Sequence, residues 1–67
     1  MPSYIINGER RSFPAPLTVG ELVRVLGKDP KALAVEVNRD VVPRAEHELR
    51  WLLEGDEVEI VTLVGGG

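Results

Sequence analysis

The sequence contains no cysteine among its 67 residues. Disulfide bridges, thiolate metal sites and cysteine nucleophiles are therefore excluded. Aromatic residues are scarce as well, with one Trp, one Tyr and one Phe. A domain of this size buries only about 60% of its unfolded surface. Without covalent or metal staples, it must depend on strong local folding signals and on close packing of aliphatic side chains.

An excess of positive charge and long apolar runs are also missing. Acidic residues outnumber basic ones by 11 to 8, which gives a formal net charge of -3. Because binding to phosphates needs a basic face, we expect no nucleic-acid partner. No apolar run approaches the ~20 residues of a membrane helix, and the first residues lack the pattern of a secretory signal. We therefore expect a cytoplasmic protein with no membrane partner.

The beginning of the chain has the pattern of a β-hairpin. Residues 3–6 are rich in β-formers, and Asn7-Gly8 follows at once. This dipeptide supplies the positive φ angles of a type I′ turn, so it is a strong hairpin signal. The return strand, Glu9 to Phe13, is polar except at its last residue. We expect it at an edge of the sheet, with its charged side chains in water.

A capping box predicts the start of one helix. In Thr18-Val19-Gly20-Glu21, the hydroxyl and the carboxylate can each accept a hydrogen bond from the other residue's backbone N–H. We expect a helix from Val19 to Leu26, which Gly27 ends in the left-handed conformation. Four apolar residues at helical spacing predict a stripe that packs on a sheet: Val19, Leu22, Val23 and Leu26.

A second pair of strands follows the helix. Leu33 to Val37 alternates apolar and polar residues, which predicts a strand with one buried face. Asn38-Arg39-Asp40 is typical of a turn, and its polar residues are expected to form the turn rather than bind a ligand. Val41-Val42 then forms a short strand, which Pro43 stops because proline cannot donate to a β-ladder.

The segment from Arg44 to Leu53 has weak periodicity. We expect a short helical turn over residues 45–48, followed by apolar side chains that fill or cover the core: Leu49, Trp51 and Leu52. His47 has no partner at a metal-ligand spacing, so we interpret it as a surface or boundary residue and predict no metal site. No Ser/His/Asp arrangement is present either, so we predict no catalytic side chain and no enzyme activity.

The last strand, Glu57 to Val64, has two different faces. Its even-numbered residues form the predicted core face: Val58, Ile60, Thr62 and Val64. The other face begins with Glu57 and Glu59 and ends with Val61 and Leu63. Since only one helix is available to cover the sheet, we expect this second face to be exposed and to offer a docking surface. The alternative is a strand buried on both faces.

Together these elements predict an α+β fold with a mixed sheet of four to five strands packed on one main helix. We expect the first and last strands to be parallel neighbours in a single domain over residues 1–64. Gly65-Gly66-Gly67 would follow as a flexible tail that reaches at most about 10 Å. Such a tail can enter a narrow active site, although a glycine terminus can also be merely frayed.

Several short motifs occur together over nearly the whole chain. They are Asn7-Gly8-Glu9, Thr18-Val19 before Glu21-Leu22, Leu33-Ala34-Val35, Asn38, Val42-Pro43-Arg44, Glu54 to Val61, and Gly66-Gly67. In this combination the sequence resembles the ThiS family, the β-grasp, ubiquitin-like sulfur carriers of thiamine biosynthesis. The resemblance implies that Pro43 and Arg44 help to dock partners, whereas the residues alone favour a strand stop followed by a solvated arginine.

The resemblance also implies a chemistry for Gly67. A ThiF-like enzyme would use ATP to adenylate its carboxyl group, and a sulfur donor enzyme would convert the adenylate to a thiocarboxylate. A ThiG-like thiazole synthase would receive the sulfur. Gly65 and Gly66 would enter the active sites, and no cofactor would bind to this chain itself. Related carriers serve molybdopterin synthesis, tRNA thiolation or protein conjugation, and a non-catalytic interaction domain is a further alternative.

Overall fold

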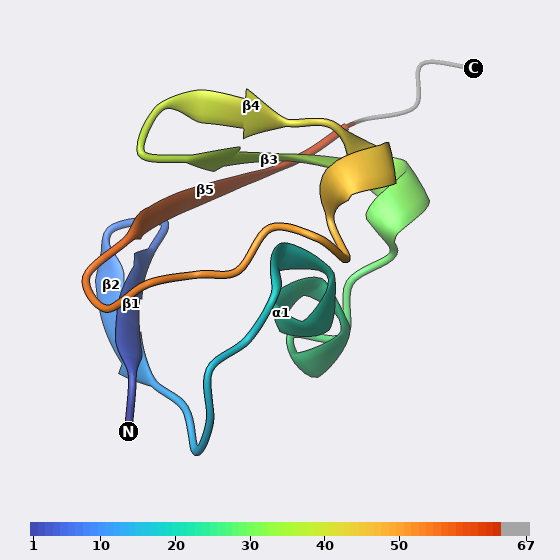
Figure 1. Cartoon of the computed structure of the whole chain (residues 1–67). Helices are drawn as coiled ribbons and strands as arrows, with labels where there is room; N and C mark the ends of the chain where they lie inside the picture. The colour runs from blue at the N-terminus through green and yellow to red at the C-terminus, as the bar shows by residue number, and fades with distance from the viewer. Residues whose placement is uncertain (64–67) are drawn as a thin grey trace.

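Within residues 1–63, one five-stranded mixed sheet carries the fold, and a single α-helix crosses one of its faces (Figure 1). The structure is a computed structural model that describes residues 1–63; Val64 and the predicted tail, Gly65 to Gly67, lie outside the described residues. The strand order is β2-β1-β5-β3-β4. The elements in chain order are β1 (Ser3–Ile6), β2 (Glu9–Ser12), α1 (Val19–Val25), η1 (Pro30–Ala32), β3 (Leu33–Val37), β4 (Asp40–Val42), η2 (Arg44–Glu46) and β5 (Glu57–Thr62).

The predicted arrangement of strands is confirmed. β1 and β2 are antiparallel, as are β3 and β4, and β3 also pairs antiparallel with β5. β1 and β5, the first and last strands of the chain, are parallel neighbours in the middle of the sheet. This mixed sheet with its one helix is the β-grasp architecture that the sequence resemblance implied.

Turn chemistry fixes both hairpins. Asn7 and Gly8 have φ angles of 49° and 86°, as a type I′ turn requires. The second hairpin turns at Asn38 and Arg39, with φ angles of 51° and 72°. The positive φ of Asn38 is supported by its side chain, whose Nδ2 donates to Asp56 Oδ1 over 3.0 Å. The polar residues of these turns therefore have structural roles.

The helix begins and ends as the sequence predicts, to within one residue. Glu21 N–H donates to Thr18 Oγ1 over 3.1 Å, and Thr18 N–H donates to Glu21 Oε1 over 2.8 Å, which completes the capping box. Gly27 follows the C-cap with a φ of 72°. Its N–H donates to the Arg24 carbonyl, and Lys28 N–H donates to the Val23 carbonyl, which is the Schellman pattern of a helix end.

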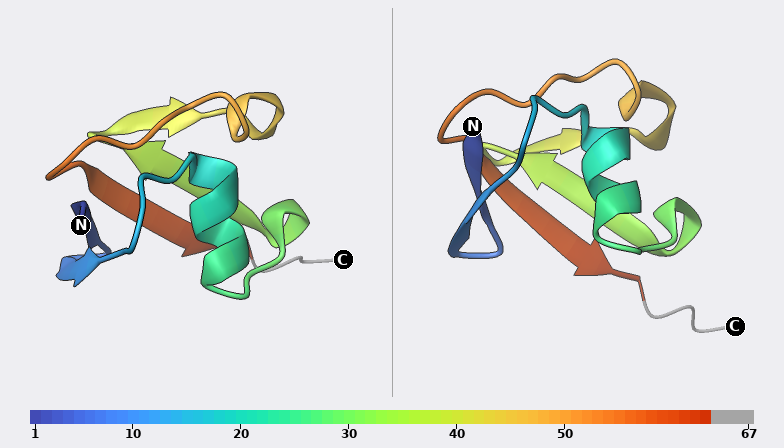
Figure 2. Two further views of the ribbon diagram at one scale, coloured as in Figure 1. Left: turned by 60° about the horizontal axis from the view of Figure 1, so that its bottom comes forward. Right: turned by 90° about the horizontal axis from the view of Figure 1, so that it is seen from below.

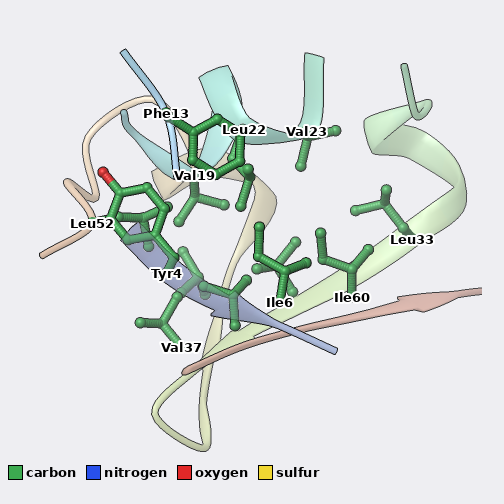
Figure 3. Packing of buried hydrophobic residues seen from close by; sticks show 13 residues of the cluster. Tyr4, Ile6, Phe13, Val19, Leu22, Val23, Leu33, Val37, Leu52 and Ile60 are labelled. Atoms are coloured by element: carbon green, nitrogen blue, oxygen red, sulfur yellow. The ribbon is translucent and has the colours of Figure 1, made fainter. Parts of the chain in front are cut away.

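The core lies between the helix and the face of the sheet that it covers (Figures 2 and 3). Its buried apolar members come from the helix, from every strand except β2 and from two loops: Tyr4, Ile6, Phe13, Val19, Leu22, Val23, Leu33, Val35, Val37, Val42, Leu52, Val58 and Ile60. The Tyr4 and Phe13 rings stack with centroids 5.6 Å apart, and the Tyr4 hydroxyl accepts a hydrogen bond from Leu17 N–H. The two smaller aromatic side chains, Tyr4 and Phe13, thus both pack in the core.

The segment after η2 contradicts two predictions. Leu52 is buried, as expected, but Leu49 is 75% exposed and Trp51 is 57% exposed. Leu49 lies in a turn, where its N–H donates to the Glu46 carbonyl. From Arg50 on, the segment runs extended beside the start of the helix: Val19 N–H donates to the Arg50 carbonyl, and Leu52 N–H donates to the Leu17 carbonyl. In an extended chain successive side chains alternate, so burying Leu52 turns Trp51 outward.

His47 is a second correction, because it is 3% exposed rather than a surface residue. Its Nε2 lies 3.1 Å from the Val42 carbonyl oxygen and donates to it, since a carbonyl can only accept. The His47 carbonyl in turn accepts from Gly20 N–H. The side chain therefore ties the end of β4 to the segment beneath the helix. Within residues 1–63, no three His, Cys, Asp or Glu side chains gather as a metal site.

Gly20 is the second residue of α1, and the Glu48 carboxylate, the far end of an exposed and flexible side chain, occupies the space that a β-carbon there would need. From there Glu48 accepts two hydrogen bonds from the Arg24 guanidinium, at 2.7 and 3.0 Å. The hydrogen bond from Arg24 lowers the pKa of Glu48. Since both groups are exposed, we expect only a small effect of this pair on stability.

Ser3 holds the Glu54 carboxylate near the start of β1. Its hydroxyl donates to Oε2 over 2.7 Å and its backbone N–H donates to Oε1 over 2.8 Å. These bonds, the hydroxyl first, lower the pKa of Glu54. A lowered folded-state pKa means that the associated stability is present above pH about 4.3, the ordinary pKa of glutamate. It is lost as the pH falls through the lowered value.

We therefore expect Ser3→Ala to raise the pKa of Glu54 towards its ordinary value, because the variant loses the hydroxyl donor and keeps only the backbone donor and the nearby Arg10 guanidinium. A carbon-detected NMR titration of the Glu54 carboxyl would measure this. Ser12→Ala is the matched control, since Ser12 lies opposite Ser3 in the β1–β2 pair and should leave the Glu54 pKa unchanged. An unchanged titration of Glu54 in Ser3→Ala would contradict the assignment.

Candidate functional site at the end of strand β5

β5 is the strand that leads to the predicted tail. It lies in the middle of the sheet, with β1 on one side and β3 on the other. Its pairing with β3 extends over the whole strand, from Val37 opposite Val58 to Leu33 opposite Thr62. One residue further, Leu63 N–H donates to the Ala32 carbonyl over 2.7 Å. The backbone is thus held in the ladder up to Leu63, directly before the residues that the structure leaves undescribed.

The predicted difference between the two faces of β5 is confirmed. Val58 and Ile60 are buried under the helix, whereas Val61 and Leu63 are 52% and 53% exposed on the open face of the sheet. The prediction that Thr62 also lies in the core is wrong, because Thr62 is exposed. Among the described residues of β5, Ile60 is therefore the last one in the core. Val64, the last predicted core residue, lies outside the described residues.

Neighbouring strands extend this open face, which we call the open-face patch. The sheet register places Ala34 opposite Val61, Glu36 opposite Glu59 and Val41 opposite Glu36. Val41 is 66% exposed. Three apolar residues of the patch, Ala34, Val61 and Leu63, lie towards the end of β5, whereas Val41 lies in the same row as two carboxylates. The patch therefore consists of apolar residues and carboxylates: Ala34, Val41, Val61 and Leu63 with Glu36, Glu57 and Glu59. Like charges directly opposite one another destabilise an isolated sheet, so Glu36 and Glu59 suit a partner of positive charge.

Pro43 and Arg44, the other docking candidates, are exposed and follow β4 at the outer edge of the sheet. The register of β3 and β4 pairs Val35 with Val42, so Pro43 comes next to Ala34, which is itself opposite Val61. Both candidate groups thus lie towards the same end of the sheet, where the chain leaves β5 (Figure 1). Gly65, Gly66 and Gly67, the predicted functional tail, lie outside the described residues.

The structure adds one residue that the sequence prediction treated only as part of a turn. The Asn7 side chain accepts from Ile60 N–H over 2.7 Å and donates to the Ile60 carbonyl over 3.3 Å. The Asn7 side chain thus makes the two hydrogen bonds that a further residue of β1 would make to β5. It does so at Ile60, beyond the last backbone pair of β1 and β5. The Asn-Gly pair signalled the turn, but nothing in the local sequence could identify a bond across 53 positions.

A model of the ThiS family matches residues 4–67. The thiazole synthase of Paramagnetospirillum magneticum is 43% identical to this chain over 63 residues, which are 94% of this chain and 19% of that protein. A second thiazole synthase, of Magnetococcus marinus, is 39% identical over 62 residues, 92% of this chain and 19% of that protein. The chain therefore spans about a fifth of the length of these two relatives. Protein ycf40 of Porphyra purpurea is 34% identical over 65 residues, 97% of this chain and 92% of that protein.

Comparison with solved structures agrees with the sequence matches. The crystal structure of the thiamine biosynthesis protein ThiS from Geobacter metallireducens superimposes with a TM-score of 0.84 at 28% identity. The match covers 97% of this chain and 99% of that one. None of the helices within residues 1–63 is long and apolar enough to cross a membrane. The family match over residues 4–67, together with this shared fold, shows that the chain belongs to the ThiS family.

Proposed function

We propose that this protein is a sulfur carrier, and that it supplies sulfur for thiazole formation in thiamine biosynthesis through the terminal carboxyl group of Gly67. The observation that carries the proposal is the match to the ThiS family, which runs through Gly67 and is accompanied by the same fold. ThiS family proteins are small carriers rather than catalysts. The role of this chain is accordingly to be acted on by partner enzymes.

The chemistry of the tail supports this role. An α-carboxyl has a pKa of about 3.3–3.7, so at neutral pH it is an anion and a poor electrophile. Attack of the carboxylate on the α-phosphate of ATP releases pyrophosphate and gives an acyl-adenylate with a good leaving group. A sulfur donor then displaces AMP and leaves a thiocarboxylate on Gly67. ATP and the catalytic groups belong to the ThiF-like activating enzyme, so the carrier needs no bound cofactor.

The two relatives that are thiazole synthases indicate which enzyme receives the sulfur. Each of them contains a stretch similar to this chain within a protein about five times as long. A carrier and a synthase that occur in one polypeptide are expected to work on the same reaction. We therefore propose a ThiG-like thiazole synthase as the protein that receives the sulfur.

The direct test is the intact mass of the protein after incubation with ATP, a sulfur donor and a ThiF-like activating enzyme. We expect a mass gain equal to the exchange of one oxygen for one sulfur, and transfer of that sulfur when thiazole synthase and its substrates are added. A variant that lacks Gly67 is the control and should show no gain. If the full chain gains no sulfur from an activating enzyme that modifies another ThiS protein in parallel, the proposal is wrong.

The open-face patch is the surface that we propose for docking the activating enzyme, with Pro43 and Arg44 at its border. Replacing both Val61 and Leu63 by Ala removes several buried methyl groups from such an interface, each worth about 0.8 kcal/mol. We expect at least a tenfold weaker binding, measured by titration calorimetry. Val25→Ala is the matched control, because Val25 is similarly exposed, at 59%, but lies on the helix. Equal affinities for both variants would contradict this assignment.

A further inference from the structure

We propose that the end of β5 has an open backbone edge at Thr62, on which an extended segment of the thiazole synthase adds as a short β-strand. The proposal rests on the proposed function, because it identifies how the recipient recognises the carrier. It concerns backbone hydrogen bonds at the side of β5, and it is therefore distinct from the side-chain contacts of the open-face patch.

The register shows which way the peptide groups of β5 point. Asn38 N–H donates to the Glu57 carbonyl and Leu63 N–H donates to the Ala32 carbonyl, so the odd-numbered residues of β5 bond towards β3. The even-numbered ones bond towards β1, since Asn7 N–H donates to the Val58 carbonyl. Backbone groups of a strand alternate in this way. The N–H and the carbonyl of Thr62 therefore point away from β3, towards the β1 side.

On that side the sheet ends early. β1 pairs with β5 only at Ile5 opposite Glu57 and at Ile6 opposite Val58, and the chain then turns at Asn7. The Asn7 side chain satisfies both backbone groups of Ile60. Within residues 1–63 no group bonds to the outward N–H or carbonyl of Thr62, which is exposed. Figure 2 shows the same arrangement: the β1–β2 hairpin lies beside the first part of β5, and the strand continues beyond it.

An unpaired N–H and carbonyl on a strand fit the backbone of another extended segment. The chemistry of the occupant follows from the neighbouring side chains. Val61 and Leu63 flank Thr62 on the open face and are half exposed, so the added strand should place an apolar residue beside them. We choose the thiazole synthase as the partner because two thiazole synthases contain a stretch that is similar to this chain. Pairing at Thr62 would also set the direction in which Gly65 to Gly67 enter the synthase.

The first test is hydrogen exchange at single amides, in the free chain and in complex with a ThiG-like synthase that has no ThiS-like segment of its own. The Leu63 amide bonds to Ala32 and should be protected in both states. The Thr62 amide should exchange freely in the isolated chain and at least 100-fold more slowly in the complex. Protection of Thr62 in the free chain, whether internal or by self-association, would overturn the proposal, and so would an unprotected Thr62 in the complex.

The second test removes only the outward donor. Thr62→Pro deletes an N–H that takes no part in the β3–β5 ladder, a position at which strands accept proline. We expect near-parent thermal stability but at least tenfold weaker synthase binding, while Thr62→Val, which keeps the N–H, binds within twofold of the parent. Parent-like binding by a folded Thr62→Pro would overturn the proposal. Failure of the proposed function would appear separately, as a chain that gains no sulfur on Gly67 while Thr62 is still protected by the synthase.

Discussion

Gly66→Val is expected to reduce adenylation of the chain at least 100-fold and to leave its folding unchanged. A β-branched side chain restricts the local backbone angles and widens a segment that must enter an enzyme active site. A displacement of the reacting carboxyl by about 1 Å is enough to cost on the order of 100-fold in rate. Stability should change by less than about 0.5 kcal/mol, because the described ladder ends at Leu63, three residues earlier.

Pyrophosphate exchange catalysed by a ThiF-like enzyme would measure adenylation, and thermal unfolding would measure stability. Gly66→Ala is the graded control: its single methyl group should give an intermediate rate if width decides the effect. A Gly66→Val protein that is adenylated at the parent rate would show that the tail need not enter a narrow site. A large loss of stability would show instead that Gly66 is part of the folded body.

Leu22→Ala should lower the free energy of unfolding by about 3 kcal/mol, the middle of the range for removing a buried leucine. Leu22 is fully buried between the helix and the sheet (Figure 3). At roughly 0.05–0.15 kcal/mol per residue, a chain of this size has about 3–10 kcal/mol in total. The variant would therefore be largely unfolded at modest urea concentrations, where the parent is still native.

Urea titrations followed by circular dichroism would give both free energies. Val25→Ala is the matched control, because Val25 lies on the same helix and is 59% exposed. It should change stability by less than about 0.5 kcal/mol. Similar losses for the two variants would contradict the assignment of the effect to the core beneath Leu22, because Ala is the best helix former and neither change lowers helix propensity.

The parts of the fold that were predicted from the sequence are those with local causes. The Asn7-Gly8 turn and the box formed by Thr18 and Glu21 are each decided within four residues, and both are confirmed. The segment around His47 and Leu49 was predicted incorrectly, because its conformation depends on bonds to distant residues. His47 is buried because its ring reaches the Val42 carbonyl, and Leu49 is exposed in a turn that ends where Arg50 bonds to the start of the helix.

The candidate site also has a part that the sequence predicted and a part that depends on distant residues. The exposure of Val61 and Leu63 followed from strand alternation and from having one helix for two faces, and it is confirmed. The outward edge at Thr62 could not be predicted, since it depends on where β1 leaves the sheet and on the bond from Asn7 to Ile60. The roles of Gly65 to Gly67 and of Pro43 and Arg44 stay predictions, which the variants and assays above are designed to test.

The parallel pairing of β1 with β5 has a consequence for how the protein folds. These two strands come from opposite ends of the chain, so their pairing closes a loop that contains almost every other residue. Contacts between distant parts of a chain slow folding, because the entropy of loop closure must be overcome before they form. The strand before the tail thus gains its second neighbour only when β1 and β5 have both been synthesised and have come together. A chain in which β5 has not yet paired with β1 would lack this support, so a partner that requires a firmly paired β5 would select folded carriers.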